Sequence, residues 1–185
     1  MTTKIKMHYI DQFIALRAAP DILRLGFFPN AKEITESFAG YVAIKVHLGI
    51  LPDRPNTEVI VVGDGSWPRT AVLCAFLSDW LITSIDPQMR VLATRQRLMD
   101  GGVCRVAVIG ERVQDIEIEP PTGLRIALMV HAHVDVPTVT RALRPDFTVS
   151  MPCCVKDNAT PDMSYEDDAV LSPHKRVNVY TRKEA

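Results

Sequence analysis

The sequence has little net charge, few aromatic residues and no long apolar run, and each shortage excludes a class of protein. The 21 lysines and arginines nearly balance the 22 aspartates and glutamates, so the formal net charge of −1 gives no overall field that attracts nucleic acid or anionic lipid. Aromatic residues form only 6% of the chain, which argues against single-strand binding by base stacking on many exposed rings. No apolar run approaches the roughly 20 residues of a membrane helix, and the N-terminus lacks the apolar core of a signal peptide. We therefore expect a soluble, cytoplasmic protein with no membrane partner.

The four cysteines do not form a disulfide framework. Cys74 and Cys104 stand alone in apolar runs, whereas Cys153 and Cys154 are adjacent. This usage is typical of a reducing compartment. With 185 residues, of which 47% are apolar, the chain is long enough for one domain with a sizeable core. We predict a single domain over residues 1–185, in which residues 1–55 form a helical cover and residues 56–185 form a sheet.

The apolar pattern predicts two helices before the first strand. One covers residues 10–25 with a breaker at Pro20, and the second begins near Asn30 and ends at Gly49. From Thr57 onward, short β-branched runs alternate with helix-length segments, which is typical of a parallel sheet buried on both faces. The expected strands are 58–62, 81–85, 103–109, 124–131 and 147–151, and the expected crossover helices are 69–77, 90–99 and 138–143.

This alternation predicts an α/β fold with a doubly wound, mostly parallel sheet and right-handed crossovers. A polar loop over residues 156–168 follows the fifth strand. The apolar pair Val170-Leu171 and residues 177–180 then predict an antiparallel C-terminal hairpin, because no helix-length segment separates them.

A glycine turn follows the first predicted strand. Gly63, Asp64, Gly65 and Ser66 lead into a helix whose first turn contains Pro68. Glycines at such a turn allow the backbone to approach a ligand, and the free N–H groups at the helix start favour a carboxylate or phosphate.

The second predicted strand ends in Asp86, about 20 residues beyond the turn, where a carboxylate can accept hydrogen bonds from ribose hydroxyls. The two features together predict a nucleoside-binding site at the switch point of the sheet. The alternative is that Gly63 and Gly65 only make a tight turn and that Asp86 begins a surface turn with Pro87.

The two leading helices, the glycine turn, the acid ending the second strand and the closing hairpin together resemble the class I, Rossmann-like S-adenosylmethionine-dependent methyltransferases. The resemblance covers residues 34 to 181. It implies S-adenosyl-L-methionine as cofactor, with its methionine part over residues 63–66, its ribose on Asp86 and its adenine beside the segment containing Glu111 and Arg112. Two positions depart from the family pattern, since Val61 replaces a common acid and Trp67 replaces the third glycine. A dinucleotide is less favoured because the last glycine is missing.

Candidate catalytic residues follow the fourth predicted strand. His131, His133 and Asp135 alternate, so they share one side of the chain where it stays extended. Methyl transfer needs a positioned nucleophile and, for a hydroxyl or ammonium, removal of a proton. The alternative is that one histidine is hydrogen-bonded in the core and the other is solvated. His131 also borders the expected cofactor site. A metal on His-x-His-x-Asp is a loose pattern without a further ligand cluster, so we predict no metal site.

The fifth predicted strand leads into Pro152-Cys153-Cys154. The pair His131-Ala132-His133 and Pro-Cys-Cys resembles a methyltransferase subgroup that includes transfer-RNA-modifying enzymes, with His133 replacing the usual Cys or Gly. The resemblance implies RNA modification. Cys153 is a candidate nucleophile, although buried thiols more often pack as small apolar side chains.

A second resemblance is to the RNA ribose 2′-O-methyltransferases, which precede the glycine turn with a Ser-Arg-Ala-x-aromatic-Lys helix. The corresponding segment here is Ser37 to Val42, so the signature lysine is absent and Lys45, three residues on, would have to replace it. Asp135 and Lys156 would be further members of that set.

Three functions therefore remain. The first, and the one favoured, is an S-adenosylmethionine-dependent methyltransferase acting on RNA, with a small molecule as the alternative acceptor and a protein partner assisting recognition. The second is an inactive relative that serves as a structural or regulatory subunit, and the third is a 2′-O-methyltransferase. Two basic clusters could contact a phosphate backbone or form ordinary solvated faces; they comprise Arg90, Arg95, Arg97 and Arg105, and His174, Lys175, Arg176, Arg182 and Lys183.

Overall fold

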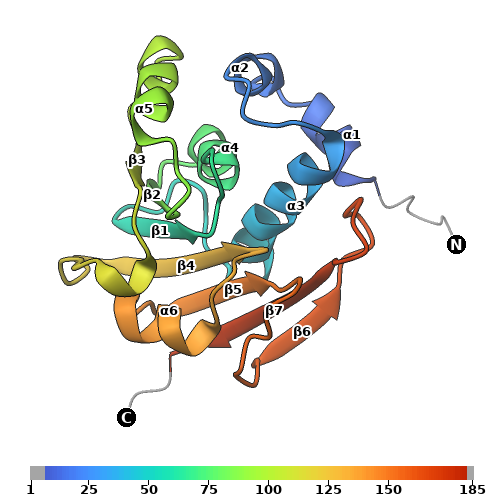
Figure 1. Cartoon of the computed structure of the whole chain (residues 1–185). Helices are drawn as coiled ribbons and strands as arrows, with labels where there is room; N and C mark the ends of the chain where they lie inside the picture. Colours follow the sequence, from blue (N-terminus) through green and yellow to red (C-terminus); the bar gives the residue numbers. More distant parts are fainter. Residues whose placement is uncertain (1–6, 183–185) are drawn as a thin grey trace, which may run out of the picture.

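A seven-stranded sheet forms the centre of the protein, and helices cover both of its faces (Figure 1). The computed structural model describes residues 7–182. The strand order is β3-β2-β1-β4-β5-β7-β6. The strands are β1 Thr57–Val62, β2 Leu81–Ile85, β3 Val106–Ile109, β4 Leu124–Val130, β5 Phe147–Met151, β6 Met163–Glu166 and β7 Arg176–Thr181. The first five strands pair in parallel and β7 is antiparallel to both neighbours, which confirms the expected mostly parallel sheet with an antiparallel hairpin.

The crossover helices lie close to the expected ranges. They are α4 Arg69–Leu77, α5 Val91–Asp100 and α6 Val136–Leu143. Strand β3 is shorter than expected, since it begins at Val106 rather than at residue 103. Burial explains why the sequence predicted these strands: β1 and β5 are buried on both faces and consist mostly of apolar or small residues, with Glu58 the exception in β1.

The N-terminal region forms more and shorter helices than the two that the sequence predicted. Residues 10–25 form α1 Tyr9–Ile14 and α2 Ala19–Arg24, because Pro20 occupies the first turn of a new helix instead of interrupting one helix. Helix α3 Ala31–Val42 begins at Asn30, whose side chain accepts a hydrogen bond from the Glu33 N–H at 3.0 Å. The helix continues as a π-helical turn over Ala43–His47.

The first strand of the hairpin is not where the sequence predicted it. Val170 and Leu171 lie in the loop between β6 and β7, and the strand is Met163–Glu166 within the segment expected to be a polar loop. Val170 is buried because this loop packs on the N-terminal helices, where the Leu171 N–H donates to Thr35 Oγ1 at 3.0 Å. The apolar pair Val170-Leu171 therefore belongs to a loop that packs on the N-terminal helices, and the prediction of a strand at this pair was wrong.

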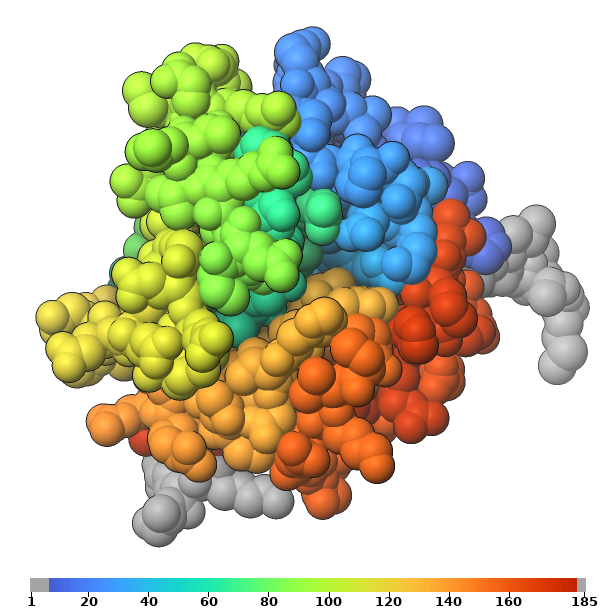
Figure 2. Space-filling model, in the orientation of Figure 1, coloured from blue at the N-terminus to red at the C-terminus, as the bar shows by residue number. Residues whose placement is uncertain are grey.

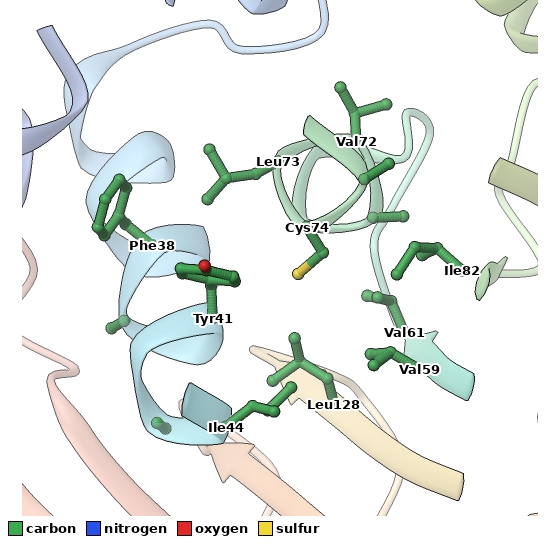
Figure 3. Packing of buried hydrophobic residues seen from close by; sticks show 14 of the residues in the cluster. Phe38, Tyr41, Ile44, Val59, Val61, Val72, Leu73, Cys74, Ile82 and Leu128 are labelled. Atoms are coloured by element: carbon green, nitrogen blue, oxygen red, sulfur yellow. The ribbon is translucent and has the colours of Figure 1, made fainter. Parts of the chain in front are cut away.

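Alternate residues of β1 face opposite layers of the molecule. Val59 and Val61 pack against α3 and α4, as Figure 3 shows, where Tyr41, Leu73 and Leu128 close the same cluster. The intervening residues Ile60 and Val62 belong to a second cluster beneath α6, together with Met129, Val136, Val139 and Leu143. The two cores hold the carboxyl ends of the central strands at one edge of the sheet, where ligands of such folds bind.

Candidate functional site

A pocket of about 550 Å³ lies where the carboxyl ends of β1, β2 and β4 meet the first half of α3. It opens where the blue, green and orange segments meet in Figure 2. The volume falls within the usual range of small-molecule sites. Its walls come from four regions of the chain: Lys32, Glu33, Glu36 and Ser37 on α3; Gly63, Asp64, Gly65, Arg69 and Thr70 at the glycine turn; Asp86, Pro87, Gln88, Arg112, Val113 and Gln114 after β2 and β3; and Val130, His131, His133 and Val134 after β4.

The glycine turn requires its glycines. Gly63 has φ +80° and Gly65 has φ +75°, in the left-handed region that favours glycine. A Cβ on Gly63 would lie 2.6 Å from the Cα of Ala132, so the turn after β1 touches the backbone of the segment after β4. This close approach holds two walls of the pocket together.

Asp86 lies at the predicted position and faces the glycine turn. Its Oδ2 accepts a hydrogen bond from the Gly65 N–H at 2.9 Å, and its Oδ1 accepts one from the Gln88 N–H at 2.7 Å. The side chain lines the pocket, although the residue is only 8% exposed. A carboxylate has about four lone-pair sites, so these two bonds leave capacity for ribose hydroxyls.

Asp64 has a structural role at the start of α4. Its carboxylate accepts hydrogen bonds from the N–H groups of Thr70 and Ala71 and from the Ser84 hydroxyl. Burial raises the pKa of Asp64 to about 6, and the hydrogen bonds from Thr70 and Ala71 partly oppose this rise. Both carboxylate oxygens of Asp64 accept hydrogen bonds from α4 or from Ser84, so the carboxylate is already engaged within the fold. A cofactor can contact only the other atoms of this residue.

Glu36 and His131 form a polar pair on the opposite wall. His131 Nε2 lies 3.3 Å from Glu36 Oε1, and the ammonium of Lys32 lies 3.2 Å from the same oxygen. Glu36 is only 3% exposed, and among the described residues neither Oε1 nor Nε2 has a partner in hydrogen-bonding geometry. Buried polar atoms normally have hydrogen-bonding partners, so this pair, with the Lys32 ammonium beside it, is a candidate contact for the polar groups of a ligand.

The backbone of His131 is strained. This residue directly follows β4 with φ +57°, which is uncommon for a residue other than glycine. Burial lowers the pKa of His131, while the nearby Glu36 carboxylate opposes that change; the imidazole of His174 lies 6.0 Å away, edge to face. Strained backbone at a pocket wall is common in functional sites.

The structure brings some predicted site residues together and separates others. His133 and Arg112 line the pocket, whereas Ser66 and the exposed Glu111 do not. Lys45 is exposed on the π-helical turn, about 13 Å along the helix from Glu36 at 1.5 Å per residue. The geometry therefore does not support Lys45 as a substitute for the signature lysine of the 2′-O-methyltransferases.

Asp135 caps α6 instead of facing the pocket. It accepts hydrogen bonds from the Thr138 N–H at 2.9 Å and from Asn158 Nδ2 at 3.0 Å. These contacts with Thr138 and Asn158 hold the pKa of Asp135 below its usual value. Its predicted catalytic role has no support from its placement.

Cys153 lies beside the pocket without lining it. Its thiol is 3.9 Å from the His131 carbonyl oxygen and 3.4 Å from the Cys154 sulfur. Burial raises the pKa of the Cys153 thiol, which disfavours the thiolate needed for nucleophilic attack.

No sequence motif indicated the α3 wall of the pocket. The second half of α3, the π-helical turn, a loop and β1 separate Glu36 from the glycine turn, and no short motif connects them. Polar residues within an apolar helical segment could nevertheless have indicated this wall. Thr35, Glu36 and Ser37 are polar residues inside the run from Ile34 to Tyr41, which is buried throughout. A carboxylate on the core-facing side of a helix needs a partner or a function.

No protein-family model and no curated protein matches the chain. Solved structures do resemble it. A mutant of MtNAS in complex with S-adenosylmethionine superposes with a TM-score of 0.55 at 14% identity, covering 94% of this chain and 70% of that chain. MtNAS in complex with MTA and tNA gives 0.54 at 13% identity, covering 95% and 69%. A protein described as an S-adenosyl-L-methionine-dependent methyltransferase from Methanococcus maripaludis gives 0.51 at 18% identity, covering 66% and 57%.

These likenesses define the class of fold. The chain has the Rossmann-like fold of S-adenosylmethionine-dependent methyltransferases, as the sequence resemblance implied. Within residues 7–182, no helix has the length and apolar character required to cross a membrane.

Proposed function

We propose that the protein is an S-adenosylmethionine-dependent methyltransferase acting on a small polar molecule. The observation that carries the proposal is the pocket at the switch point of the sheet, with Asp86 and the glycine turn on one wall and the open Glu36–His131 pair on the other. The S-adenosylmethionine found in the MtNAS complex supports this choice of ligand.

The residues of the pocket fit this cofactor. S-adenosylmethionine carries an ammonium, a carboxylate and a sulfonium, and the pocket contains acidic and basic side chains in close alternation, among them Lys32, Glu33, Arg69 and Asp86. Asp86 would hold the ribose, and the glycine turn would face the methionine part. The adenine would lie against Arg112 and its neighbours after β3.

The bound cofactor supplies an electrophilic methyl group next to a positive sulfur. The chain itself has to orient the acceptor in line with that group, exclude water and accept a proton where the acceptor carries one. Glu36 is the candidate for the last task, because it lines the pocket and its Oε1 forms no hydrogen bond within the described residues, although the Lys32 ammonium lies close to it. His131 lies beside it on the same wall, so the pair can contact a hydroxyl or ammonium group of the acceptor from one side.

The contacts that the two basic clusters make within the chain favour a small acceptor over RNA. The guanidinium of Arg97 stacks on Trp67 at 4.4 Å, and that of Arg105 pairs with Asp79 at 2.8 Å. In the second cluster, Lys175 pairs with Asp168 and Arg176 pairs with Glu166. Since these cations already have partners within the chain, they give little support for a continuous phosphate track. RNA modification and a partner protein remain predictions of the sequence.

Calorimetry with S-adenosylmethionine tests the proposal first. We expect one cofactor bound per chain, and a folded protein that releases no heat at millimolar cofactor would instead favour the structural-subunit hypothesis. The spent cofactor then identifies the group that moves. S-adenosylhomocysteine indicates methyl transfer, whereas methylthioadenosine would indicate departure of the aminocarboxypropyl group and would overturn methyl transfer while keeping the cofactor. Stimulation of turnover by RNA, but not by small amines, alcohols or thiols, would overturn the small acceptor.

A further inference from the structure

Two neighbouring loops bring three soft metal ligands together at the rim of the pocket. His133 lies between β4 and α6, and Cys153 and Cys154 follow β5. One ligand atom from each residue, a ring nitrogen and two sulfurs, lies within 4.8 Å of the others, and the two sulfurs are 3.4 Å apart. All the cysteines of the chain are free thiols. The sequence predicted no metal site, because His131, His133 and Asp135 form only a loose pattern; the structure uses Asp135 as a helix cap and places His133 beside the cysteines instead.

The spacing is close to what a tetrahedral ion requires. Zinc–sulfur bonds of about 2.3 Å and zinc–nitrogen bonds of about 2.0 Å place neighbouring ligand atoms roughly 3.5 to 3.8 Å apart. The observed group needs only small side-chain rotations to reach that spacing. His133 and Cys154 are exposed, so these rotations disturb no packed core.

The two ligand-bearing loops are fixed to one another by bonds that involve no ligand atom. The Val136 N–H donates to the Asp157 carbonyl at 3.1 Å, and Asn158 Nδ2 donates to Asp135 Oδ2 at 3.0 Å. The Asp157 carboxylate is in turn anchored to the sheet by three donors, the hydroxyl of Ser150, the amide of Asn178 and the hydroxyl of Tyr180. The loops are therefore placed before any metal arrives, which lowers the cost of ordering on binding.

We propose that His133, Cys153 and Cys154 form a Zn²⁺ site. Thiolate and imidazole ligands suit zinc, and the group contains no carboxylate of the kind that Mg²⁺ or Ca²⁺ requires. Three protein ligands leave the fourth position for water or another small ligand. Of the three residues only His133 lines the pocket described above, whereas Cys153 and Cys154 line a neighbouring surface hollow. Binding deprotonates both thiols, and the two protons pass to the buffer. The site does not depend on the proposed transferase activity.

Metal analysis of the full chain tests the site directly. The protein is loaded with Zn²⁺ under reducing conditions, dialysed, and assayed for bound zinc, and its affinity is measured by competition with a chromogenic chelator. We expect one zinc per chain. Cys153→Ser and Cys154→Ser should each weaken zinc binding by about 100-fold or more, since even outer-shell changes cost 10- to 100-fold. The matched control is Cys104→Ser, which removes an exposed cysteine far along the chain and should bind zinc as the unaltered protein does.

Two further measurements use the unaltered chain and do not depend on a variant folding. Co²⁺ in place of zinc should give sulfur-to-cobalt charge-transfer absorption, and zinc should protect Cys153 and Cys154 from alkylation while Cys104 reacts. The proposal is overturned if the chain retains no zinc, if Cys153→Ser and Cys154→Ser bind it unchanged, if Cys104→Ser loses it, or if the adjacent cysteines are found as a disulfide in protein kept under reducing conditions.

Discussion

The Nε2 atom of His131 lies 3.3 Å from Oε1 of Glu36, and both atoms are buried without a hydrogen-bonding partner among the described residues. A buried polar atom left without a partner costs about 1 to 3 kcal/mol. The Lys32 ammonium, 3.2 Å from the same Oε1, offsets part of this cost, and the remainder falls at a strained position of the chain, where His131 has φ +57°. This cost is expected where binding or catalysis uses the open atoms.

Glu36→Gln should therefore separate activity from stability. It removes the carboxylate proposed to accept the proton, so turnover of an acceptor that carries one should fall by about 10²-fold or more. The free energy of unfolding should change by no more than about 1 kcal/mol, because removal of a buried charge and loss of the ion pair with the partly exposed Lys32 oppose each other. Both are measurable, by product formation and by urea unfolding. Glu111→Gln, at an exposed acid outside the pocket, is the control. Equal losses of activity and stability would show a structural role for Glu36.

Asp86→Ala should weaken S-adenosylmethionine binding by about 1.5 to 3 kcal/mol, the contribution of hydrogen bonds to a charged group. Asp86 also accepts hydrogen bonds from the N–H groups of Gly65 and Gln88. Because Asp86→Asn keeps one acceptor oxygen, its affinity for S-adenosylmethionine should lie between those of the unaltered protein and Asp86→Ala. Calorimetry gives the affinities, and Glu111→Ala tests the acid that the structure places outside the pocket. An unchanged affinity in Asp86→Ala would place the ribose elsewhere.

Gly63→Ala should destabilise the protein by about 2 to 5 kcal/mol, from the left-handed backbone together with overpacking against Ala132. Gly49→Ala is a matched comparison, since Gly49 has φ +63° and a Cβ there would meet nothing within 4 Å. The difference between the two variants in the free energy of unfolding, measured in urea, gives the contribution of the steric contact with Ala132. If they are equally stable, the contact between the glycine turn and the β4–α6 segment is not rigid.

Asp64 should make stability depend on pH. Its folded pKa of about 6 lies above the ordinary value of 3.8, so the folded state binds the proton more tightly. The corresponding stability is fully present below about pH 4 and is lost as the pH rises through 6. At about 1.4 kcal/mol for each pKa unit, the loss approaches 3 kcal/mol. Urea unfolding at pH 4.5 and 7.5 should show a steeper decline in the unaltered protein than in Asp64→Asn. Equal declines would mean that Asp64 titrates near its ordinary pKa.

Lys45→Ala should leave cofactor binding and turnover within twofold of the unaltered protein. Lys45 is exposed and distant from the pocket, and exposed substitutions of this kind rarely change stability by more than about 0.5 kcal/mol. A strong loss of activity in Lys45→Ala would revive the 2′-O-methyltransferase hypothesis.

The sequence predicted those parts of the fold that are short, continuously buried runs bounded by breaks. Helix α4 and strands β2 and β5 have the predicted bounds, because runs such as residues 81–85 can be read from β-branched composition and from the breaks beside them. Val170 misled the prediction of the hairpin, since an apolar residue buried in a loop has the same local composition as one in a strand.

The candidate site was predictable only where a motif lies within one strand–turn–helix unit. Gly63, Gly65 and Asp86 meet because strands pair in register, a relationship that sequence spacing expresses. Glu36 reaches His131 through packing between α3 and β4, and His133 reaches Cys153 through contacts between two loops. Contacts of this kind depend on the three-dimensional arrangement of distant segments, which a single sequence does not encode in any local pattern.

The place of β7 has a consequence for the order in which the molecule forms. This strand follows β6 in the chain but lies between β5 and β6, so β6 cannot join the sheet until β7 has been made. The β6–β7 hairpin is a local structure and can dock on β5 as a unit. Its docking brings Asn178 and Tyr180 to Asp157, the anchor of the loop with the adjacent cysteines. The loop with the adjacent cysteines is thus held in place only once the hairpin has docked on β5.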